Sequence, residues 1–229
     1  MVMEKIGNGI QEALKKENMM ALEKKFTYPK EILMETESND VMVKKLIKRS
    51  IPPKYVDLEF YDKEILESLI NTEKSIFIHG KVGIGKTVLM ASVIKDYIKK
   101  NNYQAMSVFE GDHRSTNAEW ISYPAFIMKL QQMFRNNKEN PYDYATEIAN
   151  CSGLLAIDDL GAEKITDFVR QITYFIINER EQREKRMIIT SNYSLNQIDE
   201  MIDSRISSRI VGMCDIVELT GADRRIKRV

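Results

Sequence analysis

Beyond about residue 50, short apolar runs alternate along the chain with longer segments whose apolar residues recur at helical spacing. This alternation is typical of an α/β fold with a mostly parallel sheet, because parallel strands need crossover connections that are usually helices. Five of the short runs are apolar enough to form strands, which is sufficient for such a sheet. The candidate strands are residues 75–79, 104–109, 153–158, 186–191 and 215–219.

Two of the longer segments carry a clear helical period. In residues 86–99 and 166–180, apolar side chains recur every three or four positions, which places them on one face of a helix. We expect both helices to pack that face against the sheet. The apolar residues are Met90, Val93, Ile94, Tyr97 and Ile98 in the first segment, and Phe168, Ile172, Phe175 and Ile176 in the second.

The first fifty residues differ from the rest of the chain. They contain helix-like pieces that are interrupted at Tyr28-Pro29, and their charge is dense and mixed. Ile51-Pro52-Pro53 then stops any helix, since proline lacks an N–H donor and restricts the residue before it. We predict a boundary near residue 50, with a short helical, partner-binding extension at 1–50 and the main domain at 51–229. The basic residues of the extension fit either a solvated helical face or a nucleic-acid patch.

Composition and cysteine content exclude only a few classes of protein. Lys plus Arg and Asp plus Glu both number 34, so net charge gives no reason to favour nucleic acid or membranes as partners. Cys151 and Cys214 are far apart and only His79 and His113 could add imidazole ligands, so neither a disulfide framework nor a zinc site is expected. No apolar run approaches the length of a membrane span. We expect a protein of the reduced cytoplasm without a membrane partner.

The sequence GKVGIGKT, residues 80–87, fits the phosphate-loop pattern G-x-x-x-x-G-K-[ST] at every fixed position, between a predicted strand and a predicted helix. Glycines allow the backbone to curl so that successive N–H groups point at phosphate oxygens. Lys86 would then reach the β- and γ-phosphates of ATP, and the Thr87 hydroxyl would help to hold Mg²⁺. The competing interpretation is a glycine turn followed by a solvated lysine. The predicted nucleotide-binding residues of this loop are Gly80, Val82, Gly83, Ile84, Gly85, Lys86, Thr87 and Val88.

A second acidic element follows the apolar run that ends at Asp158-Asp159. In open α/β sheets, ligands bind at the carboxyl ends of the strands, so we expect Asp158 to hold Mg²⁺ directly or through water. Asp159 occupies the place of a base that activates the attacking water, with Glu163 as a second candidate. Because related enzymes often carry the longer Glu there, we predict slow or conditional hydrolysis. The alternative is a strand-end turn or a helix cap.

Three polar side chains further along the chain complete the candidate site. Asn192 ends another apolar run and could hydrogen-bond the γ-phosphate or the attacking water. It could instead cap a helix or form an Asx-turn before Leu195. Arg205 and Arg209 are four residues apart and share one face if they are helical. An arginine that reached a neighbouring subunit's γ-phosphate would stabilise the charge of the transition state. The alternative for both arginines is surface salt bridging.

Taken in order and spacing, these motifs resemble the AAA+ ATPases of the bacterial helicase-loader and transposition-helper family, the DnaC/IstB type. The resemblance covers residues 51–229, and it implies an AAA+ P-loop NTPase fold with an open parallel five-stranded sheet flanked by helices. It also implies a helical insertion at 121–150 that faces single-stranded DNA in loaders. It also implies that Arg209 is an arginine finger with Arg205 as its companion, and that Arg225 contacts nucleotide as sensor 2. The motifs are IPPKY at 51–55, the phosphate loop, LLAIDDLGAEK at 154–164, INER at 177–180, TSNY at 190–193, RISSRI at 205–210 and GADRR at 221–225.

The resemblance implies an ATPase that loads a hexameric replicative helicase onto single-stranded DNA and self-associates through Arg205 and Arg209. The alternatives are a transposition helper on duplex DNA, a nucleotide-binding adaptor that does not hydrolyse ATP, and a small-molecule kinase or GTPase. The nearest match to the guanine-binding N-K-x-D element, at 137–140, lacks its Asp. Four aromatic residues in the insertion could stack on bases or pack a core: Tyr123, Phe126, Phe134 and Tyr142.

Overall fold

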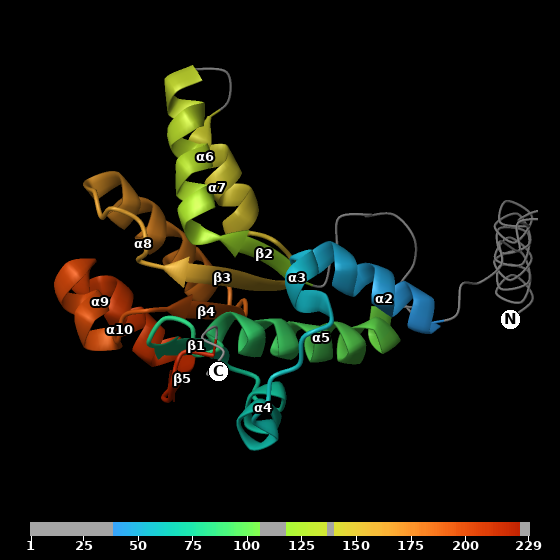
Figure 1. Ribbon diagram of the computed structural model, residues 1–229. Helices are drawn as coiled ribbons and strands as arrows, with labels where there is room; N and C mark the ends of the chain where they lie inside the picture. Colours follow the sequence, from blue (N-terminus) through green and yellow to red (C-terminus); the bar gives the residue numbers. More distant parts are fainter. Residues whose placement is uncertain (1–38, 106–117, 137–139, 225–229) are drawn as a thin grey trace, which may run out of the picture. The chain divides into compact units, whose positions relative to one another are not determined.

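The computed structural model describes residues 39–105, 118–136 and 140–224, which belong to one of two compact units of the chain. This unit contains a five-stranded parallel sheet with the strand order β2-β3-β4-β1-β5 (Figure 1). The predicted fold class, an open parallel five-stranded sheet flanked by helices, is therefore confirmed. The strands are β1 Ser75–Gly80, β2 Ala118–Ser122, β3 Leu154–Leu160, β4 Met187–Ser191 and β5 Cys214–Leu219.

One of the predicted strands is wrong. Residues 104 and 105 of the predicted strand 104–109 form the end of helix α5, and residues 106–109 lie outside the described residues. The strand that pairs with β3 is β2 instead. Its signal is weak because β2 lies at the edge of the sheet and buries only Ala118 and Ile121.

Each face of the sheet is covered by its own set of helices (Figure 1). On β1, Ile76 and Ile78 belong to a core that α2, α4 and α5 close, whereas Phe77 belongs to a core under α6 to α10. Burial on both faces explains why the inner strands read as continuous apolar runs. Within the described ranges, no helix is both long enough and apolar enough to cross a membrane. The helices are α2 Asn39–Ser50, α3 Pro53–Val56, α4 Lys63–Ile70, α5 Lys86–Ala105, α6 Tyr123–Asn136, α7 Pro141–Ala149, α8 Asp167–Gln182, α9 Leu195–Met201 and α10 Ser204–Met213.

Helix α2 packs against the sheet domain rather than standing apart from it. Ile47 is 7% exposed, and the neighbouring Ile51 is 2% exposed, in the same core cluster as Leu89 of α5. The structure describes no other part of the predicted extension at 1–50, so a partner-binding role for that extension stays a prediction.

Arg180, near the end of α8, is a fully buried cation that holds the amino ends of β3 and β4 together. Its guanidinium donates hydrogen bonds to the carbonyl oxygens of Cys151 and Gly153, at 2.9 and 2.8 Å, and to that of Arg186. Backbone dipoles therefore compensate a charge that burial would otherwise make costly. One end of both strands is fixed in this way, and the other end carries the candidate site.

The carboxyl ends of β1, β3 and β4 lie at the same edge because the strands are parallel. Strands β3 and β4 stay in register as far as Ile157, after which a bulge places Leu160 opposite Ser191. Asp159 lies in this bulge with a φ of 61°, in the left-handed region that few side chains adopt. The bulge therefore sets the directions of the two carboxylates that end β3.

Candidate functional site

The phosphate loop connects β1 to α5 and needs glycine for two separate reasons. Gly83 and Gly85 have φ values of 80° and 109°, which favour a residue without a Cβ atom. At Gly80, a Cβ would overlap the carbonyl oxygen of Leu219 at the end of β5, and at Gly83 it would overlap the carboxylate of Asp223. The loop is therefore packed closely between its own curl and the segment that follows β5.

Lys86, the first residue of α5, points back into the phosphate loop and is 5% exposed. Its ammonium donates to the carbonyl oxygens of Gly80 and Lys81, at 2.8 and 2.9 Å. It also donates to Asn192 Oδ1 at 2.7 Å, which joins the loop to the end of β4. The fold thus holds the positive charge of Lys86 in a fixed place at the carboxyl edge of the sheet. A phosphate oxygen could replace one of the present acceptors of its N–H groups.

Asn192 is available for this contact because it does not cap the helix that follows. Helix α9 begins with a capping box in which Ser194 accepts from the Gln197 N–H and the Gln197 side chain accepts from the Ser194 N–H. The alternative interpretation of Asn192 as the cap of this helix is therefore wrong.

Asp158, at the end of β3, bridges two hydroxyl groups. Its Oδ1 accepts from Thr87 Oγ1 at 3.1 Å and from Thr190 Oγ1 at 2.7 Å. Burial raises the pKa of this carboxyl above its ordinary value, the bond from Thr190 opposes the shift, and the nearby charge of Asp159 adds to it. Thr190 was not among the predicted site residues, although the TSN sequence at the end of β4 contains it.

The oxygen donors at this point suit a magnesium ion. One buried carboxylate and the Thr87 hydroxyl are hard ligands, and Mg²⁺ usually takes one or two carboxylates and completes its shell with phosphate oxygens and water. Among the described residues, no group of three or more His, Cys, Asp or Glu side chains could hold a metal ion without such a ligand. The residues present therefore fit Mg²⁺ that arrives with a nucleotide better than they fit a metal bound by protein alone.

Two further carboxylates lie close to this point in the sequence. Asp159 is only partly buried, and its backbone N–H donates to Thr190 Oγ1 at 2.9 Å. Glu163 lies in the loop after β3, and both of its carboxylate oxygens are buried. Burial raises the pKa of Glu163 as well, and the backbone N–H groups of Glu163 and Gly161 oppose the shift. Asp159 is thus the more accessible candidate for activating water.

The remaining predicted loop residues differ in exposure. Val82 is 56% exposed and Ile84 is 1% exposed, while Val88 is partly buried against the α5 side of the core. Ile84 therefore anchors the loop in the core, and only its backbone could face a nucleotide.

The segment after β5 also reaches the phosphate loop. The Arg224 N–H donates to the carbonyl oxygen of Gly83 at 3.0 Å, and its guanidinium lies over the ring of Tyr61, 3.2 Å from the centroid. Arg225, the predicted sensor 2 residue, lies outside the described residues. Arg224 belongs to the GADRR motif, but its contact with Tyr61 was not predicted, because Tyr61 lies far from that motif in the sequence and belongs to no motif itself.

Arg205 and Arg209 lie on α10, which packs against α8 and α9. Arg205 pairs with Asp203, with 2.7 Å between Nη2 and Oδ2, and Arg209 pairs with Glu181, with 3.1 Å between Nε and Oε2. Both arginines therefore form salt bridges within the chain, as the alternative interpretation expects. The role of both arginines across a subunit interface stays a prediction.

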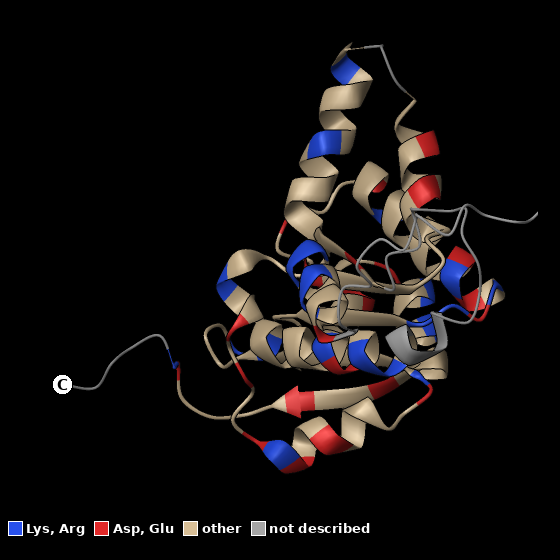
Figure 2. Cartoon of the chain, turned by 90° about the vertical axis from the view of Figure 1, so that its right-hand side faces the viewer, with Lys and Arg blue, Asp and Glu red and all other residues tan. Residues whose placement is uncertain are grey.

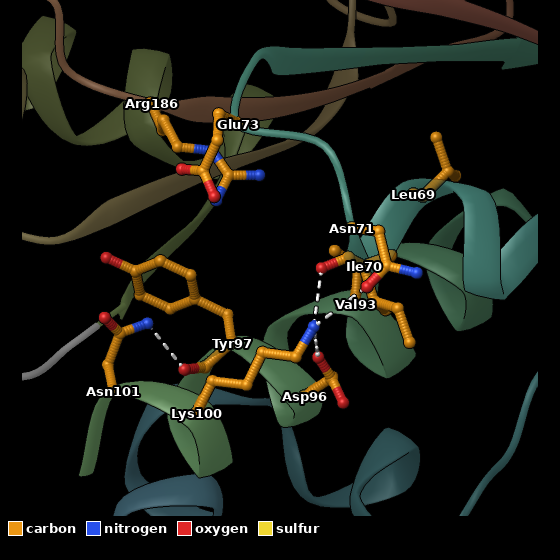
Figure 3. Close-up of a pocket in the computed structure, with 10 residues that line it drawn as sticks. All are labelled: Leu69, Ile70, Asn71, Glu73, Val93, Asp96, Tyr97, Lys100, Asn101 and Arg186. Atoms are coloured by element: carbon orange, nitrogen blue, oxygen red, sulfur yellow. Dashed lines mark hydrogen bonds and ion pairs between the residues drawn. The ribbon is translucent and has the colours of Figure 1, made fainter. Parts of the chain in front are cut away.

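A separate cavity of about 480 Å³ lies at the amino edge of the sheet, away from the phosphate loop (Figure 3). Its walls come from the end of α4, the middle of α5 and Arg186. Lys100 spans part of it, donating to the carbonyl oxygen of Ile70 at 2.8 Å and pairing with Asp96 at 3.1 Å. These polar groups hold the α4–β1 connection against α5, which gives the polar residues of the cavity a role in packing.

The family of bacterial DnaA ATPase domains matches residues 63–214, which include the phosphate loop, both acidic residues at the end of β3 and both arginines of α10. The chain belongs to this family. As a DnaA-type ATPase domain it is a member of a nucleotide-binding AAA+ family, and the resemblance inferred from its motifs is confirmed.

Two similar proteins are helicase loaders. The DnaA-type domain is 22% identical over 165 residues to the replicative helicase loader DnaI of Bacillus subtilis (strain 168), covering 66% of this chain and 48% of DnaI. The chain spans about half the length of the curated relatives it matches. A crystal structure of the DnaC helicase loader has the same fold, with a TM-score of 0.54 and 20% identity over 77% of this chain and 99% of that one.

A third similar structure is the replication initiator DnaA bound to AMPPCP and single-stranded DNA. It has a TM-score of 0.50 and 22% identity, and the match covers 70% of this chain and 44% of that one. At this identity the likeness supports the fold of the DnaA-type domain, and the ligands are those of the initiator.

Burial of the Asp158 charge predicts a conflict between stability and metal binding. Because the folded pKa is raised, the ionised carboxylate costs stability at neutral pH, and this cost disappears as the pH falls through the raised pKa. Asp158→Asn should therefore raise the melting temperature of the nucleotide-free protein at pH 7, by roughly 2–4 °C. The gain should shrink at acidic pH, and the variant should lose the Mg²⁺ dependence of nucleotide binding.

Scanning calorimetry at several pH values checks the first part, and nucleotide titration with and without Mg²⁺ checks the second. Asp167→Asn is a matched control, since that side chain is 93% exposed and should change the melting temperature little. A lower melting temperature for Asp158→Asn at pH 7 would contradict the expected cost of the buried charge.

Proposed function

We propose that the protein is an ATPase that delivers a hexameric replicative helicase to single-stranded DNA. The observation that carries the proposal is the meeting of Lys86, Asn192, Thr87 and Asp158 at one sheet edge, in a chain similar to two helicase loaders. The geometry of these four side chains supports Mg-ATP as the ligand. The similarity to helicase loaders supports the helicase and the DNA as partners.

The proposed roles follow from the positions of the side chains. Lys86 would release a loop carbonyl and bind the β- and γ-phosphates, while Asn192 would turn its amide toward the γ-phosphate. Thr87 and Asp158 would hold Mg²⁺, which neutralises phosphate charge and orients the γ-phosphate. Asp159 would orient and deprotonate the attacking water, and Arg225 would contact nucleotide within the same subunit.

Hydrolysis is proposed to be slow in the isolated chain. Asp159 is one methylene shorter than Glu and its position depends on the bulge in β3, so water activation would be weak without help. We propose that Arg209 supplies this help to the phosphate of a neighbouring subunit, with Arg205 beside it. Turnover would then depend on assembly or on DNA.

The α6–α7 hairpin supports a contact with single-stranded DNA. Figure 2 shows basic residues on α6 and acidic residues on α7, namely Lys129 and Arg135 on the first helix and Asp143 and Glu147 on the second. The DNA backbone would therefore lie along α6. Basic residues beside exposed rings are a common arrangement for binding single strands.

Burial separates the four candidate aromatic residues. Tyr123 is 1% exposed and Phe126 is 4% exposed, so both pack the core and are removed as candidates for base stacking. Phe134 and Tyr142 are each 48% exposed and meet edge to face, with 5.9 Å between ring centroids. Phe134 belongs to α6, the helix with the basic residues, whereas Tyr142 belongs to α7, the helix with the acidic ones, so Phe134 is the better candidate for stacking on a base.

Phe134→Ala should weaken binding of a short single-stranded oligonucleotide, because one stacked base contributes about 1–3 kcal/mol. The expected loss of affinity is roughly fivefold to a hundredfold, measured by fluorescence anisotropy at fixed salt. Met128→Ala is a matched control, since Met128 is an exposed apolar residue on the same helix but has no ring. Equal affinities for wild type and Phe134→Ala would argue against this contact.

The whole function is tested by loading a purified hexameric helicase onto a bubble template with ATP and with ADP. A loader should bind the helicase in pull-down and should increase unwinding several-fold in the presence of ATP. If the protein neither binds the helicase nor stimulates its loading, the proposal fails. ATP-dependent assembly on duplex DNA would favour the transposition helper, and loading without any turnover would favour an adaptor that does not hydrolyse ATP.

A further inference from the structure

The side chain of Arg209 is held against α8 by three different groups. Its Nε and Nη2 atoms donate to Asn178 Oδ1 at 3.1 and 2.9 Å, and Nη2 also donates to the hydroxyl of Tyr174 at 2.9 Å. The Glu181 carboxylate completes the set, 3.1 Å from Nε. The three acceptors are spaced three or four residues apart along α8, so they lie on one face of that helix.

Tyr174 lies under both arginines of α10. The guanidinium carbons of Arg205 and Arg209 are each 4.7 Å from the centre of its ring. The electron-rich face of an aromatic ring attracts a cation, so one side chain positions both charges. The two arginines otherwise differ, because the side chain of Arg209 is 25% exposed and that of Arg205 is 64% exposed.

We infer that Glu181, Asn178 and Tyr174 form a cradle that holds Arg209 back from a neighbouring subunit's nucleotide until subunits assemble. This inference rests on the proposed function, in which Arg209 acts across a subunit interface. Glu181, Asn178 and Tyr174 are positioning residues in this scheme, because they act through Arg209 and do not touch the nucleotide. The ligand that would compete for Arg209 is the γ-phosphate carried by a second copy of this chain.

Charge explains why the cradle would oppose assembly. Arg209 offers less positive charge to an approaching phosphate while the Glu181 carboxylate pairs with it, since both anions need the same N–H donors. The pair is also exchangeable, because the Glu181 side chain is 38% exposed and partly exposed ion pairs are weak. Asn178 and Tyr174 are neutral, so they would keep the guanidinium in place without competing as anions.

Arg205 is held in a different way. Asp203 accepts from the side chain of Arg205 at two oxygens, at 3.0 and 2.7 Å, and also accepts from the Arg205 N–H as the N-cap of α10. Releasing Arg205 would therefore disturb the N-cap of the helix, whereas releasing Arg209 would break bonds to side chains of α8 and one longer bond, of 3.3 Å, from its Nη1 to the Arg205 carbonyl oxygen. This contrast favours Arg209 as the arginine that moves.

The test is the dependence of ATP turnover on protein concentration for wild type, Glu181→Gln and Glu179→Gln. Glutamine keeps the size of the side chain and removes its charge, so Glu181→Gln should reach half-maximal turnover at roughly two- to fivefold lower protein concentration. Glu179 is a matched control, because it lies two residues away on α8 and pairs only with the exposed Arg183 among the ion pairs described. Its variant should behave as wild type.

Two further measurements separate the cradle from a merely structural role. Nucleotide affinity at low protein concentration and melting temperature should be the same for Glu181→Gln and wild type, whereas a structural role would lower the melting temperature and would not increase turnover. If Glu181→Gln needs the same or a higher protein concentration than wild type for half-maximal turnover, the cradle is overturned. If Arg209→Ala leaves turnover unaffected, the proposed action of Arg209 across the interface fails, and the cradle fails with it.

Discussion

A single carboxylate oxygen on Asp158 accepts hydrogen bonds from the start of α5 and from the end of β4. These two bonds join segments that lie 71 and 32 residues from Asp158 in the sequence. The same oxygen is buried, so its charge is costly unless hydroxyl groups or a cation compensate it. The rest of the site depends on this constraint, since the phosphate loop, β3 and β4 are held where a magnesium ion and a nucleotide would meet them.

The sheet supplies the geometry that makes this bridge possible. Parallel pairing of β1, β3 and β4 brings their carboxyl ends to one edge, while separate cores on the two faces leave the strands little freedom to slip. Close approach of Leu219 to Gly80 fixes the start of the phosphate loop from the other side. Lys86 and Asn192 are therefore held within hydrogen-bond distance by the packing of the whole domain. The residues next to each of them in the sequence would not bring them together.

Much of this arrangement could be predicted from sequence, for a physical reason. Lys86, Asp158 and Asn192 each follow a buried apolar run, and parallel strands must end at a common edge, so their meeting follows from pattern and topology. Strand β2 was missed because an edge strand buries too little to give an apolar signal. Contacts such as Thr190 with Asp158, or Arg224 over Tyr61, depend on side-chain directions that a linear pattern does not contain.

The central claim is that this edge of the sheet binds a nucleoside triphosphate through Lys86. Titration calorimetry of ATP with Mg²⁺ tests it most directly, using wild type, Lys86→Ala and Lys81→Ala. Lys81 is an exposed residue of the same loop that contributes its backbone carbonyl and not its side-chain charge to Lys86, so it is a matched control. We expect wild type and Lys81→Ala to bind with similar affinity and Lys86→Ala to show no measurable heat of binding. Equal binding by Lys86→Ala and wild type would contradict the account.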